Sequence, residues 1–454
     1  MPASVAPRSA PVLTGRYSYA SITDKISDIV LTRPMHWAWI AGGAIALALT
    51  ILFVVAVSYL FAVGVGIWGV NQPVAWAFAI TNFVWWVGIG HAGTFISAFL
   101  LLLRQPWRTS INRFAEAMTI FAVAMAGLMP ILHLGRPWFF YWLLPYPDIL
   151  GVWPQWRSPL VWDFFAIGTY ITVSILFWYM GLIPDLATLR DRAAARWKQV
   201  VYGLLALGWR GEARHWQRFD TAYLLLAGLA TPLVISVHSV VSLDFAVGNT
   251  PGWHSTIFPP YFVAGALYSG FAMALTIVIP MRAAFGLQDF ITNRHLNNMA
   301  KLALLCGAIV AYSYAIEIFM AFYSADRYEA YMVVNRMTGP YAPIYWLVIA
   351  CNVIIPQALW RSRVRASPPA LFAIAIVINI GMWLERFMII VTSLNRDFLP
   401  SAWHMFYPTF WDIATLAGSV GAFALLFLLF LRFLPAISIS EMRKLEGKEQ
   451  GGDA

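Results

Sequence analysis

Ionisable side chains inside long apolar segments are the residues of this chain best placed to do chemistry. His133 lies in ILHLGRP, Asp163 in SPLVWDFF, His238 and Asp244 in HSVVSLDF, and Arg386 in MWLERFM. A charge in hydrocarbon costs several kcal/mol, so each such residue is a candidate for function. An imidazole backed by carboxylates suits a neutral molecule that releases protons as it is oxidised. A quinol has that chemistry, because its oxidation releases two protons with two electrons.

We therefore expect a quinol-binding site in the non-cytoplasmic half of the protein. His133 and Asp163 are the expected proton acceptors. The expected supporting residues are Asp244, Arg386, His238 and Glu385. Each has a plainer interpretation. His133 at a helix end can snorkel, Asp163 can sit on a helix dipole, and Asp244 can simply end its helix. Glu385 and Arg386 are adjacent and point about 100° apart on a helix, so Arg386 can instead be a counter-ion for Asp163 or Asp244.

A second polar series suggests a proton path toward the cytoplasm. Its residues are His91, Thr94 and Ser97 in one segment and Tyr312, Tyr314 and Glu317 in another. Spacings of three and four residues place such groups near one face of a helix. The plainer interpretation is interhelical hydrogen bonding. His91 can likewise be a packing histidine, since Gly88, Gly90 and Gly93 permit close helix contact, and Glu116 is expected to form an ion pair with Arg113.

Cysteine and histidine usage bears on redox cofactors. The two cysteines, Cys306 and Cys351, lie in apolar runs, and no CxxC is present. The chain therefore cannot itself hold a c-type haem or an all-cysteine iron–sulfur cluster, and we expect no metal site. A b-haem is not expected either. By residue count His91 has no partner at its depth, whereas His133 and His238 could pair near the outer face.

Composition and hydropathy predict the elements that position these residues. The 454 residues are 60% hydrophobic and only 11% charged, with a mean hydropathy of +0.69, so lipid must cover most of the surface. We expect an all-α integral membrane protein rather than a β-barrel. The apolar runs long enough to span are 38–68, 75–103, 113–133, 160–183, 220–243, 262–285, 299–323, 343–360, 369–393 and 410–434.

The basic residues predict the orientation. Most of the 30 Lys and Arg fall on one side when both termini are placed there. The positive-inside rule makes that side cytoplasmic. We expect a cytoplasmic segment over 1–37, a membrane domain over 38–435 and a polar cytoplasmic tail over 436–454, with residues 441–454 mobile.

The loops on the opposite side are rich in Trp, Tyr and Pro. An aromatic interfacial belt explains part of this composition. The loops at 134–159 and 244–261 also suit a firm docking surface, with Trp153 and Trp253 as contact residues. A chain without its own redox centre needs such a partner to receive electrons.

Three segments together resemble a known family. The runs WWVGIGHAGTFISAFLLLLRQPWR, GLMPILHLGRPWFFYWLLPYP and SPLVWDFFAI are similar to NrfD-type, polysulfide-reductase-like membrane subunits. The resemblance covers nearly the whole chain. It is closest to the larger NrfD-like subunit (ActC) of bacterial alternative complex III, in the inner membrane.

The resemblance implies a fold, a substrate and partners. It implies two four-helix bundles, about 75–243 and 262–393, with one flanking helix at each end. It implies oxidation of menaquinol or ubiquinol near the periplasmic face, beneath an iron–sulfur subunit, with a second NrfD-like membrane subunit and multihaem cytochrome c subunits as further partners. By motif, the family's site falls on His133 and Asp163. The competing functions are a proton-coupled transporter and a structural membrane anchor for redox subunits.

Overall fold

The computed structural model describes residues 12–15, 17–143 and 156–451, and all regular structure in these ranges is helical. Ten helices there are long and apolar enough to cross a membrane. They are Trp37–Val63 (α2), Phe78–Leu102 (α3, η2 and α4), Asn112–His133 (α5), Pro159–Arg192 (α6), Ala213–Ala246 (α8), Phe258–Phe285 (α9), Asn293–Tyr323 (α10), Ala342–Trp360 (α12, η5 and η6), Pro368–Leu394 (α14) and Phe410–Phe433 (α15). The predicted all-α membrane fold and its ten spans are confirmed.

Local sequence explains where several of these helices begin and end. Proline occupies the first turn of α6, α9 and α14, where no intrahelical donor is lost. Thr409 caps α15 through a capping box with Asp412. Gly286 ends α9 with a left-handed φ of 67°, which a glycine adopts without strain.

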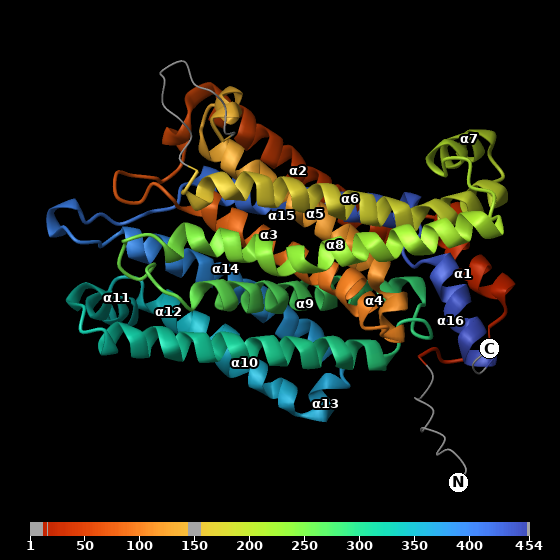
Figure 1. The fold of residues 1–454 in the computed structure, drawn as a ribbon. Helices are drawn as coiled ribbons and strands as arrows, with labels where there is room; N and C mark the ends of the chain where they lie inside the picture. Colours follow the sequence, from red (N-terminus) through yellow and green to blue (C-terminus); the bar gives the residue numbers. More distant parts are fainter. Residues whose placement is uncertain (1–11, 16, 144–155, 452–454) are drawn as a thin grey trace, which may run out of the picture.

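The spans pack as two groups of neighbours (Figure 1). Helices α3, α5, α6 and α8 form one group, and α9, α10, α12 and α14 form the other. Helix α9 joins the groups because it contacts both α3 and α8. Helices α2 and α15 pair with each other, and α15 also packs against α5.

Glycine permits the closest of these contacts. A Cβ on Gly93 would lie 2.1 Å from the carbonyl oxygen of Ala115, so α3 and α5 touch backbone to backbone. A Cβ on Gly270 would lie 2.4 Å from that of Ala92, which brings α9 equally close to α3. The expectation that Gly93 permits close helix contact is confirmed, as small residues do in membranes.

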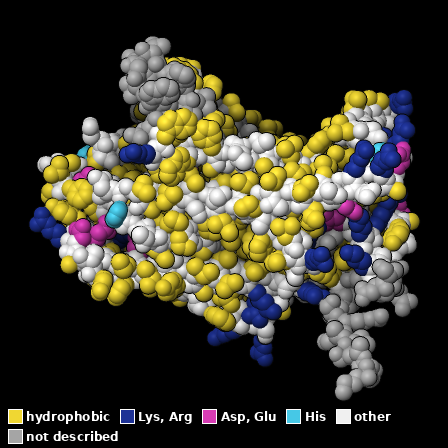
Figure 2. All heavy atoms as spheres, in the orientation of Figure 1, with side chains coloured by type: hydrophobic (Ala, Val, Ile, Leu, Met, Phe, Trp, Pro, Cys, Tyr) yellow, Lys and Arg dark blue, Asp and Glu magenta, His cyan; other side chains and the backbone are white. Residues whose placement is uncertain are grey.

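The chain ends and short helices divide between the two ends of the molecule (Figure 1). Both termini, α1 (Tyr19–Leu31), α7 (Arg196–Leu205) and α16 (Ile439–Gly451) lie at one end. Lys and Arg side chains gather there on the face seen in Figure 2. Helix α11 (Arg327–Thr338) lies at the other end, within a segment expected to be a loop.

The expectation of a mobile polar tail is wrong for the part of the tail that the structure describes. Helix α16 packs on α1 and buries Ile439 and Met442. The Ser440 amide donates to Asp185 at 3.0 Å, and Arg108 lies 3.1 Å from Glu441. The tail folds back because apolar side chains and buried ionic partners are available to it.

Topology is directly testable. Reporter fusions after α5 and α8 should report the side opposite both termini, because basic residues cluster at the terminal end. A fusion at Leu207, between α6 and α8, should report the same side as the termini. An external Leu207 would contradict the whole orientation.

Candidate functional site

Two aspartates meet between α6 and α8 near the end of the molecule opposite the termini. Asp163 lies in the first turns of α6 and Asp244 in the last turn of α8, and their carboxyl groups lie close enough to interact directly. Asp163 is only 7% exposed, and the Oδ1 atom of each carboxyl has no hydrogen-bond partner among the described residues. A hydrogen bond between two carboxyl groups needs a shared proton. The pair can therefore take up and release a proton.

A histidine pair lies deeper between α3 and α8. The rings of His91 and His238 are 4.8 Å apart, and both side chains are fully buried. His91 also stacks on Tyr170 at 5.0 Å, and the Tyr170 hydroxyl shares a 2.7 Å hydrogen bond with Thr94. Neither ring nitrogen of His238 has a partner in the parts of the chain described. His238, His91, Tyr170 and Thr94 therefore lie next to one another within the first group of helices, joined by ring contacts and by the Tyr170–Thr94 hydrogen bond.

The interpretation that His91 has no partner at its depth is wrong. His91 lies about 20 Å along α3 from Phe78, and His238 lies about 12 Å from the end of α8 at Ala246. Residue counts suggested that His91 and His238 lie at different depths in the membrane. However, α8 extends beyond its predicted apolar run of 220–243, and neighbouring helices need not begin at the same height. His238 thus pairs with His91, and its expected neighbour His133 lies elsewhere.

A third polar group lies in the second group of helices. Glu385 and Arg386 are adjacent on α14, yet the Arg386 Nη1 lies 2.8 Å from the Glu385 Oε1. Arg386 is therefore not a counter-ion for Asp163 or Asp244, because its long side chain turns back to its neighbour. Tyr314 donates to Glu385, and the Asn352 amide donates to the Tyr314 hydroxyl at 3.0 Å.

An aromatic side chain lies near both the histidine pair and the Glu385–Arg386 pair. The Arg386 guanidinium lies 4.2 Å from the ring centre of Phe262 on α9. The ring of His238, on α8, lies 5.8 Å from the same phenyl ring. Phe262 therefore contacts both the buried guanidinium and the imidazole.

His133 stands apart from these groups. It ends α5, is half-buried, and its Nδ1 has no partner in the described ranges. No hydrogen bond joins it to Asp163 within those ranges. The segment 144–155, which follows it in sequence, lies outside the described residues.

The remaining predicted residues divide between the interior and the surface. The Ser97 hydroxyl donates to the Gly93 carbonyl at 2.8 Å, inside the first group. Glu317 pairs with Arg336 of α11 at 2.5 Å. Tyr312 is 60% exposed on α10, so the structure does not bring it to the other path residues.

Of the two tryptophans predicted to contact a partner subunit, the structure describes Trp253. Trp253 is 8% exposed, and its Nε1 donates to the Ile389 carbonyl at 2.8 Å. It therefore anchors the loop to α14 and is not available to a partner, whereas the neighbouring His254 is exposed. Trp153 lies outside the described residues.

Comparison with known proteins identifies the core that carries these groups. A sequence model described as "Polysulphide reductase, NrfD" matches residues 66–396, from the end of α2 to the end of α14. The chain belongs to the NrfD family. It is also 24% identical over 410 residues to a protein of Halobacterium salinarum that is provisionally named as a membrane subunit of dimethyl sulfoxide reductase. That match covers 83% of this chain and 89% of the relative.

Sequence reasoning missed several residues of this NrfD-family core. Tyr170 and Asn352 are uncharged, so the search for intramembrane charges passed over them. A structural signal marks both neighbourhoods: π-helical turns occur at Phe95–Phe99, directly after Thr94, and at Ala350–Ile354, around Asn352. Such turns often mark functional sites. A polar residue inside an otherwise apolar segment was the available sequence signal.

Proposed function

We propose that this NrfD-family chain is the quinol-binding and quinol-oxidising membrane subunit of an electron-transfer complex in the bacterial cytoplasmic membrane. The observation that carries the proposal is the Asp163–Asp244 pair, whose two unpartnered oxygens lie near one end of the bundle. With both termini cytoplasmic, that end faces the periplasm. The relative's name, that of a reductase membrane subunit, supports a role in supplying electrons from the membrane.

The chemistry follows from the proton-accepting groups. Quinol oxidation breaks two O–H bonds and gives quinone, two protons and two electrons. In this proposal the carboxyl pair accepts one hydroxyl proton and His133, the last residue of α5, accepts the other. Because Cys306 and Cys351 are the only cysteines of the chain, the electrons pass to an iron–sulfur cluster of a partner subunit at that face.

The partners come from the resemblance to alternative complex III. They are the iron–sulfur subunit, a second NrfD-like membrane subunit and multihaem cytochrome c subunits. The relative's name instead indicates a terminal reductase as the acceptor. The proteins that co-purify with this chain decide which acceptor it serves.

The proposal is tested on the complex purified through a tag on this chain. Adding a quinol without oxygen should reduce the partner's iron–sulfur clusters, measured by their absorbance and paramagnetic resonance. His133→Ala should slow this reduction about 10²-fold, since a proton acceptor is lost. Clusters that quinol never reduces in an intact complex would reject the proposal and favour a structural anchor.

We also propose that the His91–His238 line carries protons toward the cytoplasm. His91→Leu should lower the protons moved per electron in proteoliposomes while quinol oxidation continues, because an apolar side chain breaks the line. Tyr312→Phe is the matched control, since Tyr312 lies on the exposed surface. If both variants moved protons like the parent protein, His91 would be a packing residue.

A further inference from the structure

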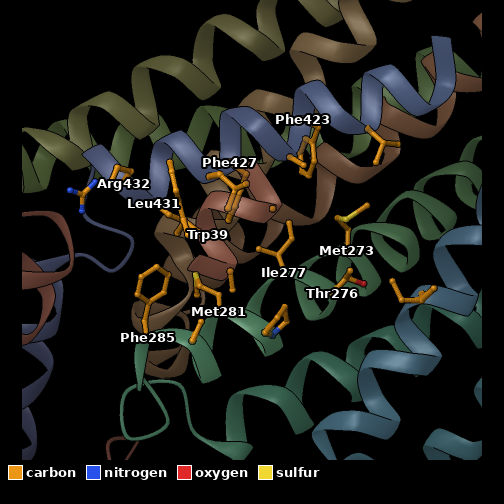
Figure 3. A pocket seen from close by; sticks show the side chains of 18 of the residues that line it. Trp39, Met273, Thr276, Ile277, Met281, Phe285, Phe423, Phe427, Leu431 and Arg432 are labelled. Atoms are coloured by element: carbon orange, nitrogen blue, oxygen red, sulfur yellow. The ribbon is translucent and has the colours of Figure 1, made fainter. Parts of the chain in front are cut away.

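A large apolar groove runs along the membrane domain, away from the residues discussed so far (Figure 3). Its volume is about 1450 Å³, and α2 and α15 form one wall while α3, α9 and α14 form the other. The family match begins at residue 66 and ends at residue 396, so α2 and α15 lie outside it. The groove therefore exists only where the two flanking helices meet the family core.

The inner wall of the groove contains polar atoms at hydrocarbon depth. Asn379 lies about 17 Å along α14 from its start at Pro368, near the middle of a hydrocarbon layer of about 30 Å. Asn379 is 7% exposed, and its Oδ1 has no partner in the described part of the chain. The Nε1 of Trp85, on α3 in the same wall, likewise has no partner among the described residues. Unsatisfied polar groups are costly in lipid and call for a ligand.

Aromatic rings surround this end of the groove. Trp86 lies 4.7 Å from Trp85 and 5.0 Å from Phe423, measured between ring centroids. Trp383 also lines the groove and is held by a 2.8 Å hydrogen bond from its Nε1 to Asn82. Aromatic walls favour a flat ring, which stacks or meets them edge to face.

We propose that the groove is a second quinone site, with the quinone ring at Asn379 and Trp85 and the prenyl tail along α9 and α15. The Asn379 Nδ2 donates to the Ala375 carbonyl at 3.0 Å and to the Thr276 hydroxyl at 3.3 Å, which orients the carboxamide. Its Oδ1 can then accept from a quinol hydroxyl, and the Trp85 N–H can donate to a quinone carbonyl. The tail follows the apolar wall of Ile277, Met281 and Leu431 (Figure 3). The site holds the ring in the bilayer's middle, and no electron transfer is assigned to it.

A phospholipid fits these observations less well. Its headgroup remains at the membrane surface, so only acyl chains would reach Asn379 and Trp85, and their polar atoms would stay unpartnered. The two arginines that line the groove also have protein partners. Arg33 donates to the carbonyls of Phe285 and Ala284 at 3.1 and 2.9 Å, and Arg432 donates to the Arg33 carbonyl at 3.0 Å. The inference rests on the groove's own residues and does not depend on the proposed outer-face site.

The test uses the intact complex in lipid nanodiscs and a photoreactive azido-quinone. Mass spectrometry of the labelled peptides should place a label near Asn379 or Trp85, and unlabelled quinone should suppress it. Asn379→Leu should reduce this label about tenfold, through loss of a hydrogen bond at hydrocarbon depth. Ile277→Trp, which adds bulk to the wall of the groove, should reduce it as strongly.

Controls separate the groove from the outer-face site and from folding defects. Leu305→Trp places the same bulk on an exposed face of α10 and should leave the label unchanged. Quinol oxidation should continue in the two groove variants even if the label is lost. Label confined to the peptides around Asp163 and Asp244, or a phospholipid retained in the groove by native mass spectrometry, would overturn the proposal. So would labelling that survives both groove variants.

Discussion

Replacing Asp163 by Asn should lower the rate of quinol oxidation by about 10²–10⁴-fold. The substitution keeps the shape of the side chain but removes a carboxyl that lies against that of Asp244. The proton from the quinol hydroxyl then lacks its acceptor. Turnover of a quinol by the purified complex measures the effect, and the amount of co-purified partner protein confirms assembly.

Because Asp163 and Asp244 lie together, a second variant tests the same assignment. Asp244→Asn should have a similar effect, and the double variant should be little worse than either single one, because the two carboxyls act as a unit. Asp220→Asn is the matched control, since Asp220 is an exposed carboxylate paired with Lys444 at the terminal end. Normal turnover by a well-assembled Asp163→Asn complex would remove this pair from the reaction.

Replacing Arg113 by Met should destabilise the membrane domain by about 3–5 kcal/mol, the cost of leaving buried charges without their partner. Arg113 lies 3.3 Å from Glu116 and 3.2 Å from Asp185, and all three side chains are buried. Its Nη2 also donates to the Gly181 carbonyl at 2.7 Å. Thermal unfolding in detergent, followed by the fraction that stays monodisperse, measures the loss.

Two comparisons show whether the uncompensated charges cause that loss. Adding Glu116→Gln and Asp185→Asn to Arg113→Met should recover part of the stability, because the buried carboxylates are removed with their counter-ion. Lys444→Met should have little effect, since the Lys444–Asp220 pair is exposed and screened by solvent. Equal stability of Arg113→Met and the parent protein would contradict the assignment of this cluster as structural.

The ion pair between Arg113 and Glu116 shows what local sequence predicts well. Residues three apart on a helix face the same side, so the pair was expected from spacing alone and is confirmed. Asp185 joins the same guanidinium from α6, and no local pattern indicated this. The same contrast applies to α16, whose polar composition predicted a mobile tail although its Ile439 and Met442 are buried.

Hydropathy by itself determined the ten spans, because twenty apolar residues in a bilayer have little alternative to a helix. It also showed which ionisable residues lie within them. Only the tertiary structure decided how these residues pair: His91 with His238, Asp163 with Asp244, and Glu385 with Arg386. Helix height, tilt and rotation come from packing against neighbours, and π-helical turns change the face a residue presents. The groove beside Asn379 likewise depends on how α2 and α15 pack against the family core. The sequence of either helix alone does not specify that packing.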